Sequence, residues 1–245
     1  MSKYLLLQYR EEAEVAKEEI ETFARQAEID VCQLDAWNYL GKEASHAAAL
    51  HFDKYVGVFI GGASTISVRE HDSREALQLG VQDSKILVQE GIPTFASCFG
   101  FQLAALALEC EVVHCPEEQE NCSLAIHLTE EGLHDELLTK LQRTPGEVMV
   151  GHMITVHREG ITSLPAGCVR LAQATYWEQI FRVEGKPFWA FQGHPEVDEQ
   201  ALRERLWIYR EKYDLHTKEQ FDEILSQYEP VHEANKLLAY FCEMF

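Results

Sequence analysis

The chain has 245 residues, of which 46% are hydrophobic and 10% aromatic, and a chain of this length and composition can bury a sizeable globular core. Its 21 Lys and Arg residues against 41 Asp and Glu residues give a formal net charge of −20. Nucleic acids and anionic membranes bind clustered basic residues, so this charge argues against both as partners.

The N-terminus carries one short apolar run that charged residues follow at once. This run is too short for the core of a signal peptide or for a membrane span, so we expect a cytoplasmic protein. The seven cysteines are scattered, whereas a secreted disulfide scaffold would be shorter and richer in Cys. We therefore predict mostly reduced thiols.

Apolar runs alternate with amphipathic segments through the first hundred residues. Four of these segments have the pattern of buried strands and two that of amphipathic helices. We predict strands at 3–9, 29–34, 55–62 and 92–97, and helices at 11–27 and 73–91. Strand–helix alternation indicates a parallel sheet with helices on both faces.

The second half contains short strands in rapid succession, which indicates antiparallel strands extending one edge of the sheet. These strands are predicted at 110–115, 123–129, 146–152, 168–175, 179–185 and 187–194, with a helix near 133–142. Three helices follow, at 199–213, 218–228 and 231–245. We expect a single domain over residues 1–245, with a core in 1–197 and a C-terminal helical extension in 198–245.

One face of the helix predicted at 199–213 is apolar. It carries Leu202, Leu206, Trp207 and Tyr213 at roughly helical spacing. Such a face usually packs on the core, and this is the interpretation we favour. A dimer contact or a lid is the alternative.

Cys98 lies in "IPTFASCFGFQLAALAL", at the sharp turn between a predicted strand and a predicted helix. A turn of this kind lifts the side chain out of the carboxyl edge of the sheet. The helix N-terminus then favours a thiolate, and the N–H of Phe99 can point at an oxyanion. Free Cys is also one of the most buried residue types. The local pattern therefore leaves two interpretations, an inert buried thiol and a nucleophile.

A base for such a nucleophile is available in "FWAFQGHPEV", where His194 follows a strongly apolar strand. Pro195 favours an extended conformation at His194, so Glu196 can lie beside the imidazole. An ordinary surface turn is the alternative for this tripeptide alone. Upstream, Gly61 and Gly62 follow a buried strand, where exposed N–H groups could supply a second oxyanion donor. A simple turn is again the alternative.

In their order, these blocks resemble the class I (triad-type) glutamine amidotransferase family, which has a Gly-Gly-Pro loop, a Gly-x-Cys-x-Gly-x-Gln elbow and a His-Pro-Glu. This chain has "GGAS", "ASCFGFQ" and "HPE" in the same order. The likeness extends through most of residues 1–197. The phrase "AFQGHPEV" is closer to the stand-alone branch, which includes γ-glutamyl peptidases and GMP-synthase-like amidotransferase domains.

The resemblance implies a flavodoxin-like α/β fold and a γ-glutamyl thioester mechanism that needs no cofactor and no metal. Cys98 would be the nucleophile, His194 the base and Glu196 the residue that orients the imidazole. The N–H groups of Gly62 and Phe99 would form the oxyanion hole. Gln102 and His152 would bind the substrate.

Three departures from the family pattern stand out. Ala96 replaces the usual Gly of the elbow, and Ala63 replaces the Pro of the Gly-Gly-Pro loop. The block that usually reads Ser-His-x-Asp is here "GHMIT", in which His152 matches but no acid follows. In the family this block helps to hold the α-amino end of glutamine, so the natural substrate need not be glutamine itself.

Several functions are compatible with these features. The first is a hydrolase or transferase acting on a small-molecule γ-glutamyl amide, and the second is a glutaminase subunit that delivers ammonia to a separate synthase. A catalytically silent binding or regulatory protein is the third. A ThiJ/PfpI-like protein is disfavoured, because those proteins lack such a His-Pro-Glu. A homodimer remains open.

A zinc site is a weak alternative in "ECEVVHCPEEQENC". This segment contains Cys110, His114, Cys115 and Cys122, but their spacing does not follow the usual Cys and His pattern of zinc sites. Three further histidines, His127, His134 and His157, are isolated and predicted to be ordinary surface or core residues.

Overall fold

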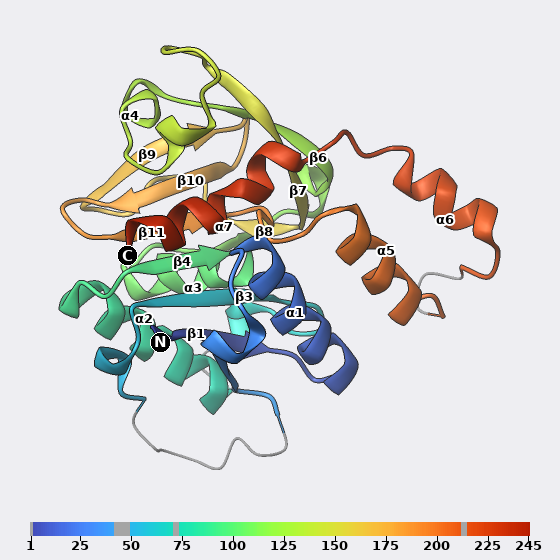
Figure 1. The fold of residues 1–245 in the computed structure, drawn as a ribbon, viewed down its shortest axis with the longest axis horizontal. Helices are drawn as coiled ribbons and strands as arrows, with labels where there is room; N and C mark the ends of the chain where they lie inside the picture. The colour runs from blue at the N-terminus through green and yellow to red at the C-terminus, as the bar shows by residue number, and fades with distance from the viewer. Residues whose placement is uncertain (1, 42–49, 71–73, 212–214) are drawn as a thin grey trace.

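The computed structural model describes residues 2–41, 50–70, 74–211 and 215–245. A seven-stranded sheet lies at its centre in the order β2-β1-β3-β4-β11-β10-β9 (Figure 1). The first five of these strands are parallel to one another, and β10 is antiparallel to both of its neighbours, β11 and β9. Their bounds are Tyr4–Tyr9 (β1), Leu34–Asn38 (β2), Gly57–Ala63 (β3), Thr94–Ser97 (β4), Cys168–Gln173 (β9), Glu178–Val183 (β10) and Phe188–Phe191 (β11).

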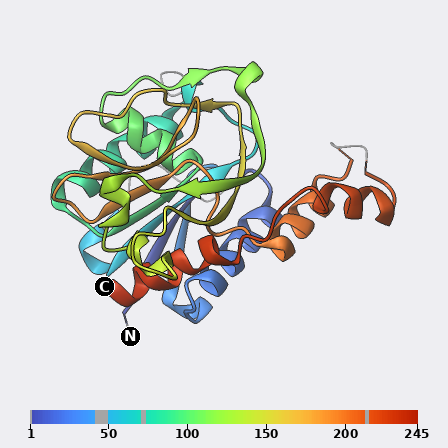
Figure 2. The same cartoon turned by 90° about the horizontal axis from the view of Figure 1, so that it is seen from above.

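Helices cover both faces of this sheet (Figure 2). Helices α1 (Ala13–Gln26) and α7 (His232–Met244) contribute to one core cluster, and α2 (Glu75–Glu90) and α3 (Phe99–Ala107) to the other. The predicted fold class is therefore confirmed: a mostly parallel sheet between helices, with antiparallel strands at one edge and helices at the C-terminus.

Two short ribbons lie outside the main sheet. One pairs β5 (Val113–His114) with β8 (Glu159–Gly160), and the other pairs β6 (Glu120–His127) with β7 (Met149–His157). Both ribbons are antiparallel. The rapid succession of strands predicted in the second half is thus divided between the sheet edge and the two ribbons.

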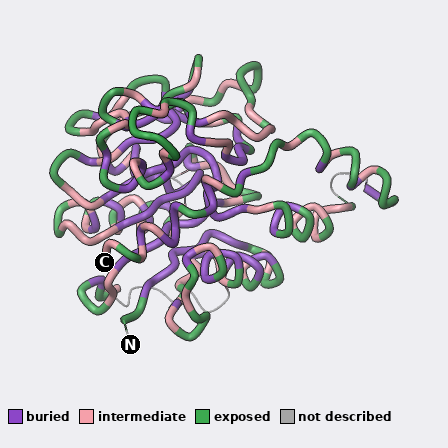
Figure 3. Tube along the Cα trace, turned by 45° about the horizontal axis from the view of Figure 1, so that its top comes forward, coloured by how far each residue is buried: buried purple, intermediate pink, exposed green. Residues whose placement is uncertain are grey.

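The central strands are continuous apolar runs because both of their faces are covered by helices. All six residues of β1 are buried, and the strand interiors form the buried centre of the molecule (Figure 3). Helix α2 ends at Gly91, whose φ of 67° is the left-handed conformation that favours glycine at a helix C-terminus.

Several predicted elements differ in their bounds, and two of these differences have a clear local cause. The second strand begins at Leu34 instead of residue 29, because a capping box between Asp30 and Gln33 first closes a 3₁₀ turn. In place of a continuous helix near 133–142 there are a short helix, α4 (Glu130–Leu133), and a 3₁₀ turn. Between them the side chain of Asp135 accepts hydrogen bonds from two backbone N–H groups that follow it, which is a local alternative to helix continuation.

The C-terminal helices α5 (Glu199–Ile208) and α6 (Lys218–Leu225) project from the body of the molecule (Figures 1 and 2). Leu202 packs into a small separate cluster with residues of α6. Trp207, in contrast, is 59% exposed, so the expectation that it packs on the core is wrong. Its ring is tilted against the Phe221 ring, and the Arg210 guanidinium lies over it. Tyr213 lies outside the described residues. No helix in the described part of the chain is long and apolar enough to cross a membrane.

Gly100, in the first turn of α3, lies directly against β3. A Cβ at this position would lie 2.6 Å from the carbonyl oxygen of Ile60 and 2.8 Å from its Cβ. We expect Gly100→Ala to lower the free energy of unfolding by about 1–3 kcal/mol, because the helix would have to move away from the strand. A thermal or urea unfolding curve measures this change. An unchanged stability would mean that α3 can shift without cost.

Candidate active site

Three parallel strands that are neighbours in the sheet bring the candidate residues together. The register pairs Ala96 of β4 with Ile60 of β3, and Ser97 with Phe191 of β11. Carboxyl ends of adjacent parallel strands meet at one edge of a sheet, where α/β proteins bind their ligands. The residues at or just after these three strand ends are Gly62, Cys98 and His194.

Cys98 stands at a strained turn between β4 and α3. Its φ is 51° and its ψ −99°, a conformation that costs a non-glycine residue of the order of 1–3 kcal/mol. The turn is held by its own hydrogen bonds, since Cys98 donates its N–H to Phe191 O at 2.7 Å and accepts from Gln102 N at 3.1 Å. Ala96 is fully buried in β4, so the elbow forms with a Cβ at the position where the family has glycine.

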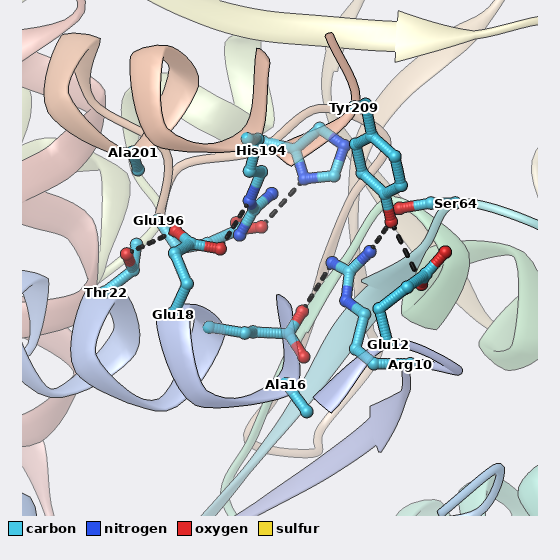
Figure 4. A network of polar contacts seen from close by, with 12 residues as sticks. Arg10, Glu12, Ala16, Glu18, Thr22, Ser64, His194, Glu196, Ala201 and Tyr209 are labelled. Atoms are coloured by element: carbon cyan, nitrogen blue, oxygen red, sulfur yellow. Dashed lines mark hydrogen bonds and ion pairs between the residues drawn. The ribbon is translucent and has the colours of Figure 1, made fainter. Parts of the chain in front are cut away.

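His194 and Glu196 form a buried pair. Their atoms Nδ1 and Oε1 are 2.7 Å apart, His194 is 8% exposed and Glu196 is fully buried (Figure 4). A turn in which Val197 donates its N–H to His194 O at 3.1 Å fixes their spacing. Of the predicted triad, His194 and Glu196 are thus hydrogen-bonded to each other, and the charge of Cys98 acts on the His194 imidazole.

Charge favours an ionised pair at this position. Burial lowers the pKa of His194, but the charges of Cys98 and Glu196 and the hydrogen bond with Glu196 outweigh burial and raise it to about 10. Burial raises the pKa of Glu196, but the charges of His194 and Arg205 outweigh burial and hold it below its usual value. A cationic imidazolium is the kind of neighbour that activates a cysteine nucleophile.

The two candidate oxyanion residues flank Cys98. A Cβ on Gly62 would lie 2.9 Å from Cε1 of the His194 ring, so this part of β3 can approach the imidazole only as glycine. Phe99 is the first residue of α3, where backbone N–H groups have no partner within the helix. Its side chain is buried against the Tyr9 ring, with 4.9 Å between the ring centroids.

A buried ion pair lies against Gly61 and Gly62. Arg10 Nη2 lies 2.6 Å from Glu19 Oε1, and both side chains are almost fully buried. Arg10 also donates from Nη1 to Ser64 Oγ at 2.8 Å (Figure 4). A Cβ on Gly61 would lie only 2.6 Å from Glu19 Oε1. The sequence does not indicate this pair, because nothing in "QYREE" distinguishes an arginine whose side chain is buried.

Gln102 lies one helical turn after Cys98 and is 4% exposed. Its Nε2 donates to the carbonyl oxygen of Glu159 at 2.7 Å, and the Glu159 carboxylate accepts a hydrogen bond from Ser67 Oγ at 2.8 Å. Gln102 thus ties α3 to the first residue of β8, close to the loop that follows β3.

The block "GHMIT", which departs from the family pattern, forms part of β7. Ile154 accepts the N–H of His194 at 2.7 Å, and a Cβ on Gly193 would lie 2.7 Å from both Ile154 O and Met153 Cε. His152 is half-buried on the same strand, two residues before Ile154. The block therefore holds the backbone of the candidate base in place and supplies no acid.

Asn235 of α7 is a second contributor that the sequence did not mark. It is 6% exposed and donates from Nδ2 to the carbonyl oxygens of Pro195 at 2.8 Å and of Val197 at 3.1 Å. These two residues flank Glu196. Both acceptors are backbone atoms about 40 positions away, so no side-chain motif in the sequence predicts the contact.

We expect Asn235→Ala to destabilise the protein by about 1–3 kcal/mol, because two buried carbonyl groups lose their donor. Since the turn that carries Glu196 also loses its support, turnover should fall by about tenfold or more. Unfolding curves and steady-state kinetics on the same preparation measure both effects. Full turnover at reduced stability would show that the turn holds without α7.

The residues of the weak zinc alternative have separate partners. Cys110 lies 3.4 Å from Ser163 O, His114 3.1 Å from Glu159 Oε1, Cys115 3.5 Å from Glu117 Oε2 and Cys122 3.6 Å from Thr155 Oγ1. Within the described ranges, no group of three or more His, Cys, Asp or Glu side chains is arranged to hold a metal ion.

Three solved structures share the fold with this chain. A glutamine amidotransferase from Thermotoga maritima is 15% identical, with a TM-score of 0.74 over 99% of this chain and 97% of that one. A glutamine amido transferase from Methylobacillus flagellatus is 16% identical, with a TM-score of 0.67 over 99% and 94%. A putative GMP synthase subunit from Thermoplasma acidophilum is 17% identical, with a TM-score of 0.57 over 87% and 98%.

At such low identity these structures establish the fold alone. No curated protein sequence matches the chain. The model of the family "Glutamine amidotransferase class-I" matches residues 54–207, more than half of the chain. This stretch contains the glycine pair, the cysteine elbow and the His-Pro-Glu turn. The chain belongs to the class I glutamine amidotransferase family.

Proposed function

We propose that the protein cleaves a γ-glutamyl amide bond, in glutamine or in a γ-glutamyl compound, through a thioester on Cys98. One observation carries the proposal: a cysteine at a strained helix N-terminus acts through its charge on a histidine whose Nδ1 lies 2.7 Å from a buried glutamate. Such a set can activate a nucleophile and return its proton, which is what acyl transfer requires.

In the first half of the reaction the Cys98 sulfur attacks the γ-carbonyl carbon. The carbonyl oxygen takes the negative charge, and the N–H groups of Gly62 and Phe99 stabilise it. His194 carries the thiol proton and donates it to the leaving amine, so the C–N bond breaks with a neutral leaving group. A γ-glutamyl thioester remains on Cys98.

In the second half water attacks the thioester. His194 accepts a proton from this water and returns it to sulfur as the C–S bond breaks and glutamate leaves. Glu196 keeps its carboxylate on Nδ1 throughout, which holds the ring in the orientation that serves Cys98. An amine in place of water would give transfer to a new γ-glutamyl amide.

Gln102 and His152 are proposed to contact the glutamyl part of the substrate. The position of Gln102 on the same helix face as Cys98 supports this role. The 151–155 block supplies no acid for the α-amino end of the substrate. Glutamine and other γ-glutamyl amides share that end and differ in the amine on the γ-carbonyl, so both remain candidate substrates.

A panel of γ-glutamyl amides tests the proposal, with release of glutamate as the readout and glutamine included in the panel. Cleavage of at least one member that depends on Cys98 supports it. A folded protein that cleaves none of them, and whose Cys98 forms no adduct with a γ-glutamyl electrophile, is a silent binding protein on the same fold.

The alternative within the same chemistry is a glutaminase subunit that delivers ammonia to a separate synthase. The likeness in fold to a putative GMP synthase subunit is the observation that supports this alternative. A chain that releases glutamate from γ-glutamyl peptides but is inert on glutamine would exclude it. Activity on glutamine that appears only with a second protein would favour it.

A further inference from the structure

Arg10 follows strand β1 and turns its side chain into the molecule, where it is only 2% exposed. Its backbone is fixed to the end of β2, because its N–H donates to Asn38 Oδ1 at 3.1 Å and its carbonyl oxygen accepts from Asn38 Nδ2 at 2.7 Å. The guanidinium therefore starts from a backbone that two neighbouring strands hold in place.

A fully buried carboxylate of α1 sets the orientation of this guanidinium. Nη2 of Arg10 lies 2.6 Å from Glu19 Oε1, and the other oxygen of Glu19 accepts a hydrogen bond from Gln8 Nε2 at 2.9 Å. Gln8 also donates to the carbonyl oxygen of Ala16 at 2.8 Å, so the carboxylate is bound to a side chain that α1 itself holds. Because a guanidinium is a planar fork, the contact with Glu19 fixes the direction of its second arm.

The second arm reaches the segment that contains the glycine pair. Nη1 of Arg10 donates to Ser64 Oγ at 2.8 Å (Figure 4). A Cβ on Gly62 would lie 3.2 Å from Nη2 of Arg10, and a Cβ on Gly61 would lie 2.6 Å from Glu19 Oε1. Three of the four residues from 61 to 64 therefore lie against the buried ion pair.

The pairing of the sheet leaves this segment without a regular register. Strand β3 pairs with β4 only as far as Ile60. Its register with β1 is interrupted directly after that residue and resumes at Ala63. The two glycines between them stand opposite one residue of β1, which is the arrangement of a β-bulge, where the ladder of hydrogen bonds is locally disrupted.

The sequence also lacks a restraint that the family pattern has at this place. Proline fixes its own φ, whereas Ala63, which stands at the same position here, does not. The hydrogen bond from Arg10 to Ser64 acts one residue later. It restrains the segment from the side where the proline is absent.

We infer that Arg10 is a positioning residue for the oxyanion hole: its guanidinium, held by Glu19, fixes the segment 61–64 and so aims the N–H of Gly62. The inference rests on the proposed function, since it assigns the support of a group that this function uses. An oxyanion hole stabilises charge because its donors are aimed before the reaction begins. A loosened segment therefore weakens the hole even though the N–H of Gly62 is still present.

The loss of this support has a kinetic signature. The oxyanion forms only after attack on the carbonyl, so its stabilisation enters kcat and leaves KM almost unchanged. Iodoacetamide, in contrast, reacts with Cys98 at a saturated carbon, where a C–S bond forms and iodide leaves without an oxyanion. The rate of this alkylation reports on Cys98 and His194 and is independent of Gly62.

Ser64→Ala is the first test, because Ser64 is exposed and its replacement leaves the buried ion pair intact. We expect kcat on a γ-glutamyl amide to fall by about tenfold and KM to change by less than about twofold. The rate of alkylation by iodoacetamide should equal that of the wild-type protein. A rise in KM at unchanged kcat, or a fall in alkylation as large as the fall in kcat, overturns the inference.

Arg10→Lys tests the two-armed contact. Lysine keeps a cation opposite the buried Glu19, so the variant should fold, but a single ammonium does not reproduce both arms of the fork. We expect kcat to fall by about tenfold or more with unchanged alkylation. In this background Ser64→Ala should lower kcat no further, because the bond that it removes is already absent. Fully additive losses in the double variant would contradict the inference.

Two variants serve as matched controls. Thr65→Ala removes an exposed hydroxyl from the next position of the same loop, and Arg143→Lys makes the same exchange at a side chain that is 70% exposed. Both should keep the wild-type kcat. If either control loses as much kcat as its counterpart, the effect belongs to any change of that kind and the inference is wrong.

NMR relaxation separates this inference from the proposed function, because it needs no substrate. The Gly62 amide should show no microsecond-to-millisecond exchange in the wild-type protein and clear relaxation dispersion in Ser64→Ala and Arg10→Lys. Unchanged relaxation of Gly62 in both folded variants overturns the role of Arg10. If the wild-type protein cleaves no γ-glutamyl amide, the proposed function fails, while relaxation at Gly62 still decides on Arg10.

Discussion

Cys98→Ser is expected to lower turnover of a γ-glutamyl amide by about four orders of magnitude or more. A serine hydroxyl keeps the shape of the side chain at the elbow but does not ionise beside His194 as a thiol does. Steady-state release of glutamate measures the loss. Mass spectrometry after incubation with substrate should detect a thioester on the wild-type protein and none on the variant.

The same substitution is expected to change the free energy of unfolding by less than about 1 kcal/mol, because it exchanges atoms of similar size at the edge of the core. Cys168→Ser is the matched control. Burial raises the pKa of the Cys168 thiol to about 12, so this cysteine stays protonated and its loss should leave turnover intact. Retained activity in the Cys98 variant, together with a large drop in its free energy of unfolding, would show that Cys98 is a structural cysteine.

His194→Ala is expected to lower turnover by about 10³-fold or more. The substitution removes the cation that stabilises the thiolate and the acid that protonates the leaving amine. The loss should therefore be larger for an alkyl amine, which must be protonated to leave, than for a nitroaniline. Comparison of kcat/KM for these two kinds of leaving group measures the difference.

Alkylation of Cys98 gives an independent readout for this variant. Because the pKa of His194 is raised to about 10, His194 is a cation at pH 6, so iodoacetamide should alkylate Cys98 there faster in the wild-type protein than in the variant. His134→Ala is the control, because this side chain is exposed and contacts Glu130 of its own helix. A loss of turnover below tenfold in His194→Ala would assign the base to another residue.

Much of the fold was predictable because its strands carry local signals. The run at 3–9 reads as a fully buried strand, and it is one. The prediction was less accurate where side chains close local hydrogen bonds, as Asp30 does before β2 and Asp135 does after α4. Such bonds compete with regular structure at single residues, and periodicity over a window does not register them.

For the candidate site, the sequence predicted the side chains but not what supports them. His194 and Glu196 are two residues apart, so an extended turn alone brings them together. Arg10, in contrast, pairs with Glu19 nine residues later, and Asn235 donates to the backbone of Pro195, 40 residues earlier in the chain. Contacts of this kind produce no recognisable spacing of residues in the sequence.

The residue pattern of the chain predicts the kind of chemistry: a cysteine at a strand–helix turn, a histidine followed by a glutamate, and a glycine pair, each at the end of an apolar run. The fold makes these three strand ends neighbours, because β3, β4 and β11 are adjacent in the sheet although β11 lies about 90 residues after β4 in the chain. The fold also sets the charge of the buried pair. Burial alone would neutralise His194 and Glu196, but their mutual contact and the charges of Cys98 and Arg205 outweigh burial and keep both ionised.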